Sequence, residues 1–295
     1  MASPAVSVVL PVRDGGDKLL FAVRSVLLQS IPDWELLVLD DGSTDSSLLE
    51  IEAIRDTRIQ VIRDPVRRGL AHRLNQGIGL ARGDYIARMD ADDIAFPRRL
   101  ELQAQWLDRN RAVDLLGTRA LAFELDGHPI GLLPFRQSHA AICRRPWLGF
   151  HVPHPTWMGR IAWFRQYRYR IPEVHRAEDQ ELLLRSYPKS RFECLTEVLL
   201  GYRLTSSPLH RTLGARYRMA GAQAKAHFSG GRPVFAVLGV GASLAKGAAD
   251  IALVLAGKKL RTARGLESAS PTLLEEWKRV WRSVQELGNQ RAEFG

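Results

Sequence analysis

The chain has 295 residues and 45% hydrophobic content, enough for one large α/β domain and a smaller appendage. Its two cysteines, Cys143 and Cys194, exclude a disulfide framework and fit a reducing compartment. The net charge of +10 favours an anionic partner, which is nucleic acid, a membrane surface or a phosphorylated acceptor. No basic-then-apolar signal pattern precedes the first apolar run, so we expect a cytoplasmic protein.

Strands and helices alternate along the first ninety or so residues. Short apolar runs predict strands over residues 6–12, 34–39, 58–63 and 85–89. Apolar residues at helical spacing predict helices over residues 18–29 and 70–81, and a further helix with Thr44 or Asp45 as its N-cap. The alternation predicts a parallel sheet with right-handed crossovers, and ligands bind such sheets beyond the carboxyl ends of the strands.

Carboxylates gather at these strand ends. The five that we expect at this edge of the sheet are Asp14, Asp40, Asp41, Asp90 and Asp92. Residues 90–93 carry three carboxylates within four positions, which repel one another unless a cation lies between them. A divalent ion that bridges the phosphates of a nucleotide would supply this cation, whereas the alternative is a solvated acidic turn. For Asp93 we favour a structural role as a helix N-cap.

Two later segments also carry residues suited to chemistry. Glu178 and Asp179 open a strongly helical segment, where acidic side chains commonly compensate the helix dipole. His154 lies between two prolines, which hold the backbone extended. A histidine that is satisfied by backbone groups in a tight loop is the alternative to a ligand-binding one.

Five blocks occur in order and resemble family 2 glycosyltransferases. They are residues 6–12, 38–45, 87–93 with the following 97–101, 154–158 and 177–182. The resemblance covers roughly residues 5–205 and implies a GT-A fold, which is a Rossmann-like, mostly parallel sheet flanked by helices. It also implies a nucleotide-diphospho-sugar donor, most commonly a UDP-sugar, a divalent cation (Mn²⁺ or Mg²⁺) and transfer with inversion.

The resemblance assigns the donor site to residues at the strand ends. Asp40 and Asp41 match positions that contact the uracil and ribose, although one of them could instead cap a helix. The end of the first strand frames the base, at Pro11, Val12 and Arg13.

The resemblance places the metal beside the Asp-X-Asp segment of residues 90–92. There Asp92 is the favoured metal ligand, and Asp90 lies nearer the ribose or sugar as the second candidate. Ala91 lies between them in the donor site.

The remaining roles implied by the resemblance concern the reaction itself. Asp179 matches the catalytic base, which takes the proton of the acceptor hydroxyl. The candidate contacts to the diphosphate or acceptor are His154, Arg160, Glu178 and Arg203.

Other functions are weaker on the sequence. The Gln-X-X-Arg-Trp block of processive synthases is absent, and residues 200–205 stand in its place. We therefore expect transfer of one or a few sugars. The expected acceptor is a glycan or a lipid-linked precursor in cell-surface polysaccharide synthesis. A dehydrogenase is excluded because the first βα turn lacks Gly-X-Gly-X-X-Gly. Nucleic acid is not expected, since the acidic cleft would repel it. A non-catalytic sugar-nucleotide or glycan binder on the same fold is the alternative function.

The composition changes near residue 206, so we expect a catalytic domain over 1–205 and a helical extension over 206–295. Residues 234–256 are long enough to span a bilayer, but Lys246 and Asp250 make a span costly and we expect them to pair. A peripheral helix on the anionic inner face of the membrane fits better, followed by the cationic residues Lys258, Lys259, Arg261 and Arg264. Packing on the catalytic domain is the second choice. A last amphipathic helix is expected over 275–287.

The apolar stripe of this helix would face the membrane or the domain, with Gly239, Ser243, Lys246 and Asp250 on the other side. Its members are Val234, Val237, Leu238, Gly241, Leu244, Ala245, Ala248, Ile251 and Leu255.

Overall fold

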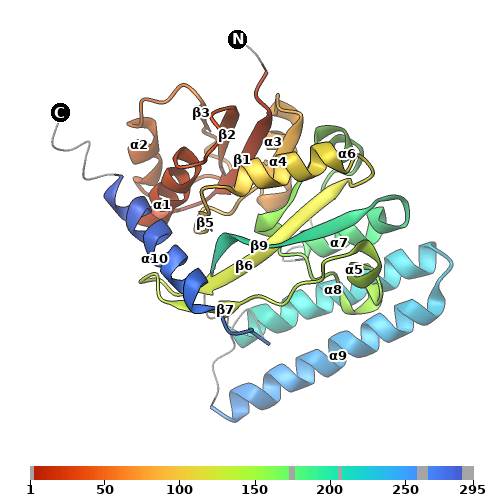
Figure 1. The fold of residues 1–295 in the computed structure, drawn as a ribbon. Helices are drawn as coiled ribbons and strands as arrows, with labels where there is room; N and C mark the ends of the chain where they lie inside the picture. The colour runs from red at the N-terminus through yellow and green to blue at the C-terminus, as the bar shows by residue number, and fades with distance from the viewer. Residues whose placement is uncertain (1–2, 173–176, 205–207, 258–264, 288–295) are drawn as a thin grey trace.

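The computed structural model describes residues 3–172, 177–204, 208–257 and 265–287. Within these residues nine strands form one sheet, in the order β3-β2-β1-β4-β8-β6-β9-β5, with β7 beside β6 (Figure 1). The strands are β1 (Val6–Val12), β2 (Trp34–Asp40), β3 (Ile59–Ile62), β4 (Tyr85–Arg88), β5 (Ile94–Ala95), β6 (Leu115–Phe123), β7 (Pro129–Leu132), β8 (Met158–Arg160) and β9 (Phe192–Arg203).

Helices cover both faces of this sheet. The α-helices are α1 (Gly16–Leu27), α2 (Ser47–Glu52), α3 (Leu70–Leu80), α4 (Arg99–Arg109), α5 (His139–Ile142), α6 (Ile161–Gln166), α7 (Glu178–Ser186), α8 (Leu209–Ser229), α9 (Pro233–Leu255) and α10 (Pro271–Glu286). Three 3₁₀ turns, η1 (Pro146–Leu148), η2 (His154–Thr156) and η3 (Tyr187–Lys189), complete the elements of the described residues.

The predicted parallel half of the sheet is confirmed, because β1 pairs in parallel with both β2 and β4, and β2 with β3. The other half is mixed: β8 runs antiparallel to β4 and β6, whereas β6 and β9 are parallel. The strands were predicted to within about a residue at each end. The helix over residues 18–29 begins two residues earlier, at Gly16, and the helix after β2 begins at Ser47 with Ser46 as its N-cap.

Alternate residues of the buried strands face two separate layers of helices. Even positions of β1, such as Val8 and Leu10, pack in a core cluster with residues of α1, α2, α4 and α10. The odd position Val9 packs on the other face, with residues of α3, α6 and α7. A strand buried on both faces therefore needs the near-continuous apolar sequence that β1 and β2 have.

The register brings the predicted donor residues to one edge of the sheet. Val12 at the end of β1 pairs with Asp40 at the end of β2, and Val9 pairs with Arg88 at the end of β4. The residues that follow β4, including Asp90, therefore lie beyond the same carboxyl edge. The strand alternation alone predicted this edge, and the topology confirms it.

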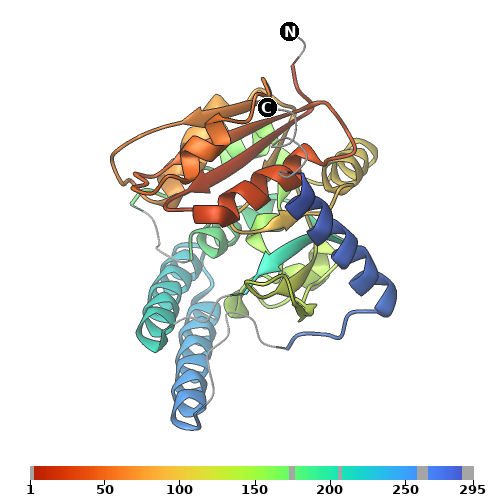
Figure 2. The same cartoon turned by 90° about the vertical axis from the view of Figure 1, so that its left-hand side faces the viewer.

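Helices α8 and α9 form an antiparallel hairpin that projects from one side of the sheet (Figures 1 and 2). The α8–α9 turn passes through Gly231, whose φ of 67° is a conformation that few residues other than glycine adopt. The hairpin contacts the rest of the protein through α7 and the η1 turn. Met219 and Ala226 of α8 pack against the core cluster that contains α3, α6 and α7.

The apolar stripe of α9 points away from the protein. The buried residues of α9 lie on the opposite face, where most residues are small: Ala236, Gly239, Gly247 and Asp250. The stripe residues, in contrast, are 41–83% exposed where they are large: Val234, Val237, Leu238, Leu244, Ile251 and Leu255. Packing of the stripe on the catalytic domain, the second choice from sequence, is therefore wrong. Gly239 explains the choice of face, because a Cβ there would lie 3.0 Å from the Gln223 side chain of α8.

The expected pairing of Lys246 with Asp250 is also corrected. Asp250 instead forms an ion pair with Arg216 of α8, and the ammonium of Lys246 donates to the carbonyl of Leu148 in η1, at 2.9 Å. Both groups thus attach α9 to its neighbours. Among the residues that the structure describes, Pro233–Leu255 is the helix long and apolar enough to cross a membrane. The cationic residues predicted to follow it, at 258, 259, 261 and 264, lie outside the described residues.

The last helix, α10, belongs to the sheet's own core although it ends the predicted extension. Trp277 and Val284 are almost fully buried in the cluster that contains β1 and α1. Nη1 of Arg24, in α1, donates to the Val284 carbonyl at 3.3 Å. The amphipathic helix predicted over 275–287 is confirmed and begins four residues earlier, at Pro271.

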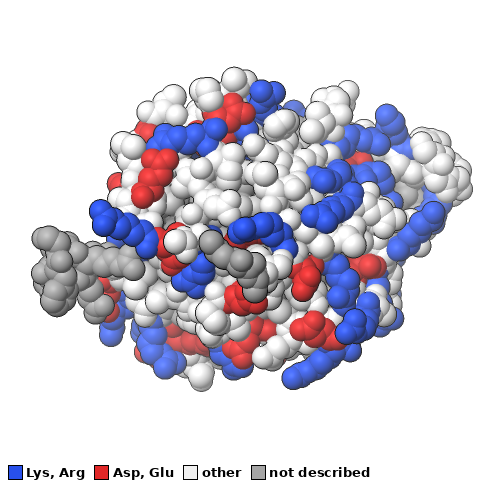
Figure 3. All heavy atoms as spheres, turned by 90° about the horizontal axis from the view of Figure 1, so that it is seen from above, with Lys and Arg blue, Asp and Glu red and all other residues white. Residues whose placement is uncertain are grey.

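Positive charge is spread over the face of the protein that Figure 3 shows. On the face seen in Figure 3, Lys and Arg side chains are interleaved with Asp and Glu side chains. The high net charge thus does not gather into a single basic patch on that face.

Candidate functional site

The end of β2 presents two aspartates with different surroundings. Asp40 accepts a hydrogen bond from the backbone N–H of Ser43 at 2.8 Å. The side chain of Asp41 is more fully engaged, since it accepts from the N–H groups of Arg68 and Gly69 and from Nε of Arg73, at 2.7 to 3.1 Å. Asp41 therefore holds the start of α3, and among the described residues its carboxylate accepts more hydrogen bonds than that of Asp40.

The end of β1 lies beside Asp40. Pro11 and Val12 are buried, whereas Arg13 is exposed and lies 3.5 Å from the carboxylate of Asp14. Asp14 accepts from the N–H of Thr44 at 2.8 Å, so the loops after β1 and β2 are tied together. This contact helps to shape the edge where we expect the base.

The segment after β4 concentrates negative charge. Asp90 forms an ion pair with Arg88, two residues before it. Burial and the charge of Asp90 raise the pKa of Asp92 above its usual range, and Arg203 opposes this shift. Ala91 lies between the two aspartates and packs partly on the core.

The expected N-cap role of Asp93 is wrong. Its Oδ1 accepts from the backbone N–H of Arg203 in β9 at 2.9 Å, and helix α4 starts only at Arg99. Oδ2 of Asp93 has no hydrogen-bond partner among the described residues. Burial, together with the charges of Asp90 and Asp92, raises its pKa well above the usual range.

The chemistry of this segment fits a divalent cation that is shared with a diphosphate. No group of three or more His, Cys, Asp or Glu side chains within the described ranges is arranged to hold a metal alone. Magnesium-type ions, however, are commonly held by one or two carboxylates together with substrate phosphates. Asp92, with Asp90 beside it, supplies that donor set, so the residues present fit the group.

Asp179 lies in the first turn of α7, which packs on the α3–α6–α7 face of the sheet. Gln180 donates to Oδ2 of Asp179 at 3.1 Å, and the same side chain accepts from the N–H of Phe150 at 2.8 Å. Burial raises the pKa of Asp179, while Gln180 and then Arg88 lower it. The charge of Arg88 thus acts on Asp179 as well as on Asp90. Glu178, one residue earlier, is half-buried in the first turn of α7.

His154 lies in the η2 turn. Its Nε2 is 2.6 Å from the hydroxyl of Tyr169, and Tyr169 is held through its backbone N–H and carbonyl by the side chain of Asn75. Burial, with a further contribution from Arg88, lowers the pKa of His154 well below 6.5. The histidine is thus neutral and is satisfied by a side chain rather than by the backbone.

Two arginines that the resemblance marked for the diphosphate or acceptor lie in structural contacts. Arg160 pairs in register with Tyr85, at the start of β4 and so at the opposite end from Asp90, and it donates to the Leu107 carbonyl at 2.6 Å. Arg203 donates to the backbone carbonyl of Asp92 at 2.8 Å and lies over the Phe123 ring. Arg203 therefore stabilises the backbone of the turn that carries Asp92.

Arg88 is the site residue that the sequence reasoning missed. The available signal was an arginine within a buried apolar strand, two positions before an Asp-X-Asp segment. Its pairing with Asp90 could have been inferred from the strand period, because side chains two apart share a face.

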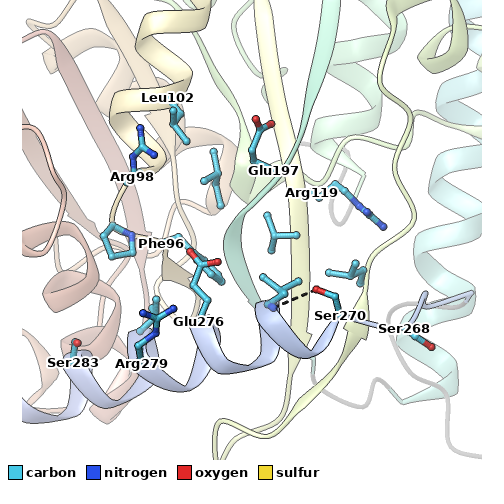
Figure 4. Close-up of a pocket in the computed structure, with 16 residues that line it drawn as sticks. Phe96, Arg98, Leu102, Arg119, Glu197, Ser268, Ser270, Glu276, Arg279 and Ser283 are labelled. Atoms are coloured by element: carbon cyan, nitrogen blue, oxygen red, sulfur yellow. Dashed lines mark hydrogen bonds between the residues drawn. The ribbon is translucent and has the colours of Figure 1, made fainter.

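A separate pocket of about 780 Å³ lies between α10 and the strands β5 and β9 (Figure 4). Arg98, Arg119 and Glu197 line it together with residues of α10, such as Glu276 and Arg279. Of the site residues expected from sequence, none is among those that line this pocket. It is therefore distinct from the carboxylate edge.

The fold and this edge define a GT-A glycosyltransferase, and comparisons with known proteins agree. Residues 7–168 match the sequence model of "Glycosyl transferase family 2". The chain belongs to this family.

Curated relatives support the same family. The putative glycosyltransferase EpsE of Bacillus subtilis is 34% identical over 217 residues, covering 71% of this chain and 77% of EpsE. An Escherichia coli enzyme, the UDP-Glc:alpha-D-GlcNAc-diphosphoundecaprenol beta-1,3-glucosyltransferase WfgD, is 31% identical over 112 residues, covering 38% of this chain and 44% of WfgD.

Solved structures share the fold. The S. aureus TarS 1–349 structure has a TM-score of 0.58 at 20% identity, with 75% of this chain and 64% of that chain covered. The mannosyltransferase PcManGT from Pyrobaculum calidifontis, in complex with GDP-Man and Mn²⁺, has a TM-score of 0.60 at 18% identity, with 87% and 80% covered. The predicted family, fold and glycosyltransferase class are thus confirmed.

Proposed function

We propose that the protein is a metal-dependent, inverting glycosyltransferase that uses a UDP-sugar. One observation carries this proposal: Asp90, at the end of β4, forms an ion pair with the buried Arg88, whose charge also favours the ionised forms of Asp92 and of Asp179 at the start of α7. These are the groups that a single displacement at an anomeric carbon needs.

Each residue has one role in this reaction. Asp40 accepts a hydrogen bond from the nucleoside, with Pro11, Val12 and Arg13 framing the base. Asp92, with Asp90 beside it, would hold a divalent ion, Mn²⁺ or Mg²⁺, which would supply positive charge to the leaving diphosphate. Asp179 takes the proton from the acceptor hydroxyl as that oxygen forms its bond to the anomeric carbon and the bond to the diphosphate breaks. Attack from the face opposite the leaving group inverts the anomeric configuration.

The acceptor in this proposal is a lipid-linked glycan precursor of a cell-surface polysaccharide. WfgD, by its name, transfers glucose to a diphosphoundecaprenol-linked sugar, which is held in a membrane. The outward apolar stripe of α9 would lie in the inner membrane surface, beside such an acceptor. We therefore propose peripheral attachment to the cytoplasmic face of the membrane.

A donor screen tests the proposal. Release of nucleoside diphosphate is followed with UDP-glucose, UDP-galactose, UDP-N-acetylglucosamine and GDP-mannose, each with Mn²⁺, with Mg²⁺ and with chelator. We expect release from one UDP-sugar, only with metal, and faster release when a polyprenyl-diphosphate-linked sugar is added. Binding of a nucleotide sugar without any turnover on any acceptor would instead favour the non-catalytic binder.

A further inference from the structure

The side chain of Gln180 joins the proposed base to the backbone of a neighbouring segment. Its Nε2 donates to Oδ2 of Asp179 at 3.1 Å and to the carbonyl of Phe150 at 3.2 Å. Its Oε1 accepts from the N–H of Phe150 at 2.8 Å. A primary amide has two N–H donors and one acceptor oxygen, so the contact with Phe150 uses one donor and the oxygen, and the other donor serves the carboxylate.

The segment around Phe150 is shaped to receive this amide. Gly149 has no side chain, and a Cβ there would lie 2.9 Å from Oε1 of Gln180. The η1 turn just before it is held by the α8–α9 hairpin, because Nε2 of Gln223 in α8 donates to the Trp147 carbonyl at 2.8 Å. Gln180 therefore bonds to a backbone that is itself fixed in place.

The contact also acts on the charge of Asp179. Burial raises the pKa of this carboxyl group, and the largest opposing effect is the hydrogen bond from the Gln180 side chain. The backbone N–H of Gln180 and then the guanidinium of Arg88 lower the pKa further. Since a carboxylate accepts such hydrogen bonds and a carboxylic acid accepts them less well, Gln180 favours the form of Asp179 that can take up a proton.

Other titratable side chains belong to the same surroundings. Burial, and then the charges of Asp179 and Glu178, raise the pKa of the Tyr169 hydroxyl. Burial, with Arg88, lowers the pKa of His154, whose Nε2 lies 2.6 Å from that hydroxyl. Tyr169 and His154 are thus uncharged at neutral pH, and Glu178 is the neighbouring carboxylate from which a titration has to distinguish Asp179.

We propose that Gln180 is a positioning residue for the transfer reaction, which holds the carboxylate of Asp179 in the orientation that meets the acceptor hydroxyl. This proposal rests on the proposed function, because it takes Asp179 as the base. Gln180 acts through Asp179 and touches neither substrate. Its amide is fixed on the Phe150 backbone, and so it restrains rotation of the carboxylate while one N–H remains directed at Oδ2.

The first test is Gln180→Leu, which keeps a side chain of similar size and removes the amide. We expect kcat to fall by about ten- to a hundredfold and the KM for the donor to change by less than about threefold. The pH at which kcat falls to half on the acidic side should rise by about one unit, because loss of a hydrogen bond to a carboxylate raises its pKa. All proteins are measured at the same saturating Mn²⁺, so that any effect of the ion on Asp179 is common to them.

The second variant is Gln180→Glu, which keeps an oxygen for the N–H of Phe150. It replaces the donor to Asp179 with a second carboxylate, and like charges disfavour ionisation. The half-point of kcat on the acidic side should therefore rise at least as far as in Gln180→Leu.

Gln29→Leu is the matched control, because Gln29 makes the same kind of two-way contact with a distant part of the backbone. Its Nε2 donates to the Phe96 carbonyl at 2.8 Å, and its Oε1 accepts from the N–H of Leu100 at 2.9 Å. This variant should lower the melting temperature, as Gln180→Leu does, and leave the half-point of kcat in place.

A second measurement needs neither metal nor turnover. The protein is labelled with carbon-13 at the carboxyl carbon of aspartate, which excludes Glu178, and the signal of Asp179 is identified by its loss in Asp179→Asn. The pKa read from this signal should be about one unit higher in Gln180→Leu than in the wild type.

Two results would overturn the proposal alone: an unchanged kcat profile and Asp179 titration in Gln180→Leu, or a higher KM for the donor at normal kcat. If Gln180→Leu does not fold, Gln180→Glu decides by the same readouts. A wild type that turns over no nucleotide sugar on any acceptor overturns the proposed function as well.

Discussion

Nε2 of His154 and the hydroxyl of Tyr169 are 2.6 Å apart, in a buried contact between the η2 turn and the chain that leads to α7. Burial lowers the pKa of His154 and raises that of Tyr169, so both side chains are neutral. A single hydrogen bond joins them. The contact joins the η2 turn to the segment that follows α6.

This contact predicts a pH dependence of stability. In the unfolded chain His154 takes up a proton near pH 6.5, whereas in the folded protein it does so only well below that. The stability that neutral His154 contributes is thus complete above about pH 6.5. It is lost as the pH falls from there towards the pKa of His154 in the folded protein. Between about pH 7 and pH 5 the melting temperature of the wild type should fall more than that of His154→Gln. Equal falls in the two proteins would show that another group is responsible.

Asp92→Asn should lower the rate of sugar transfer by about a thousandfold or more, because the amide keeps the shape of the side chain and loses the charge that would hold the metal. Its metal-free melting temperature at neutral pH should be equal to or higher than that of the wild type. The reason is that the folded pKa of Asp92 lies above 3.8, so its ionised form destabilises the metal-free fold. This advantage should shrink as the pH falls towards about 4, and full activity in excess chelator would exclude a metal-dependent reaction.

Asp179→Asn should lower turnover by roughly a hundredfold or more and leave the affinity for UDP-sugar nearly unchanged. The donor contacts are made by residues of β1, β2 and the Asp92 turn, while Asp179 acts on the acceptor. Kinetics and donor calorimetry on the same sample separate the two effects. Asp84→Asn, an exposed aspartate just before β4, is the control and should behave as wild type. Lost donor affinity with normal turnover would reassign Asp179 to binding.

Attachment to a membrane can be tested without disturbing the fold, because the stripe of α9 is exposed. Val237→Ser combined with Leu244→Ser should leave the melting temperature unchanged and reduce flotation with anionic liposomes by about tenfold or more. High salt should release only part of the wild type, since screening removes only the electrostatic share.

The matched control replaces Leu49 and Leu125 by serine. These two leucines are 61% and 63% exposed, but they lie in α2 and in the β6–β7 connection, away from α9. They should float like the wild type. Failure of the wild type to float under any condition would argue against membrane attachment, and a fraction that resists alkaline carbonate would mean that the helix spans the bilayer.

Trp277→Ala should destabilise the protein by about 3 to 5 kcal/mol, because Trp277 is 1% exposed and fills the space beside Gly201 and the Phe123 ring. Tyr217→Ala, in the exposed part of α8, should change the free energy of unfolding little. Chemical denaturation measures both. A small effect at Trp277 would show that α10 is not part of the cooperative unit.

Local sequence signals were enough to predict the parallel half of the fold and the positions of its carboxylates. Residues 6–12 are apolar except for Ser7, and strand ends in such folds define one edge. The difference between Asp40 and Asp41 was not predictable, because it depends on Arg68, Gly69 and Arg73, which come from a distant loop and helix. The same holds for Asp93, whose partner is the backbone of Arg203, 110 residues away.

The sequence also left open which face α9 buries against the rest of the protein. Helical periodicity separated an apolar from a polar side, and burial of the apolar side is the usual outcome. Here the small residues Gly239 and Gly247 allow α8 to approach closely, and Arg216 neutralises Asp250. Close approach and ion pairing between α8 and α9 decide which face of α9 is buried. The periodicity of apolar residues along the sequence reveals neither.

Because the carbonyl of Val284 is held by Arg24, 260 residues earlier, the first layer of helices on the sheet is complete only after α10 has been made. During synthesis the α8–α9 hairpin therefore leaves the ribosome before α10 can close the core. An exposed apolar hairpin on an unfinished nascent chain would meet the membrane, or a chaperone, before the enzyme is complete. Deleting α10 should therefore reduce the yield and solubility of the protein more than its membrane affinity.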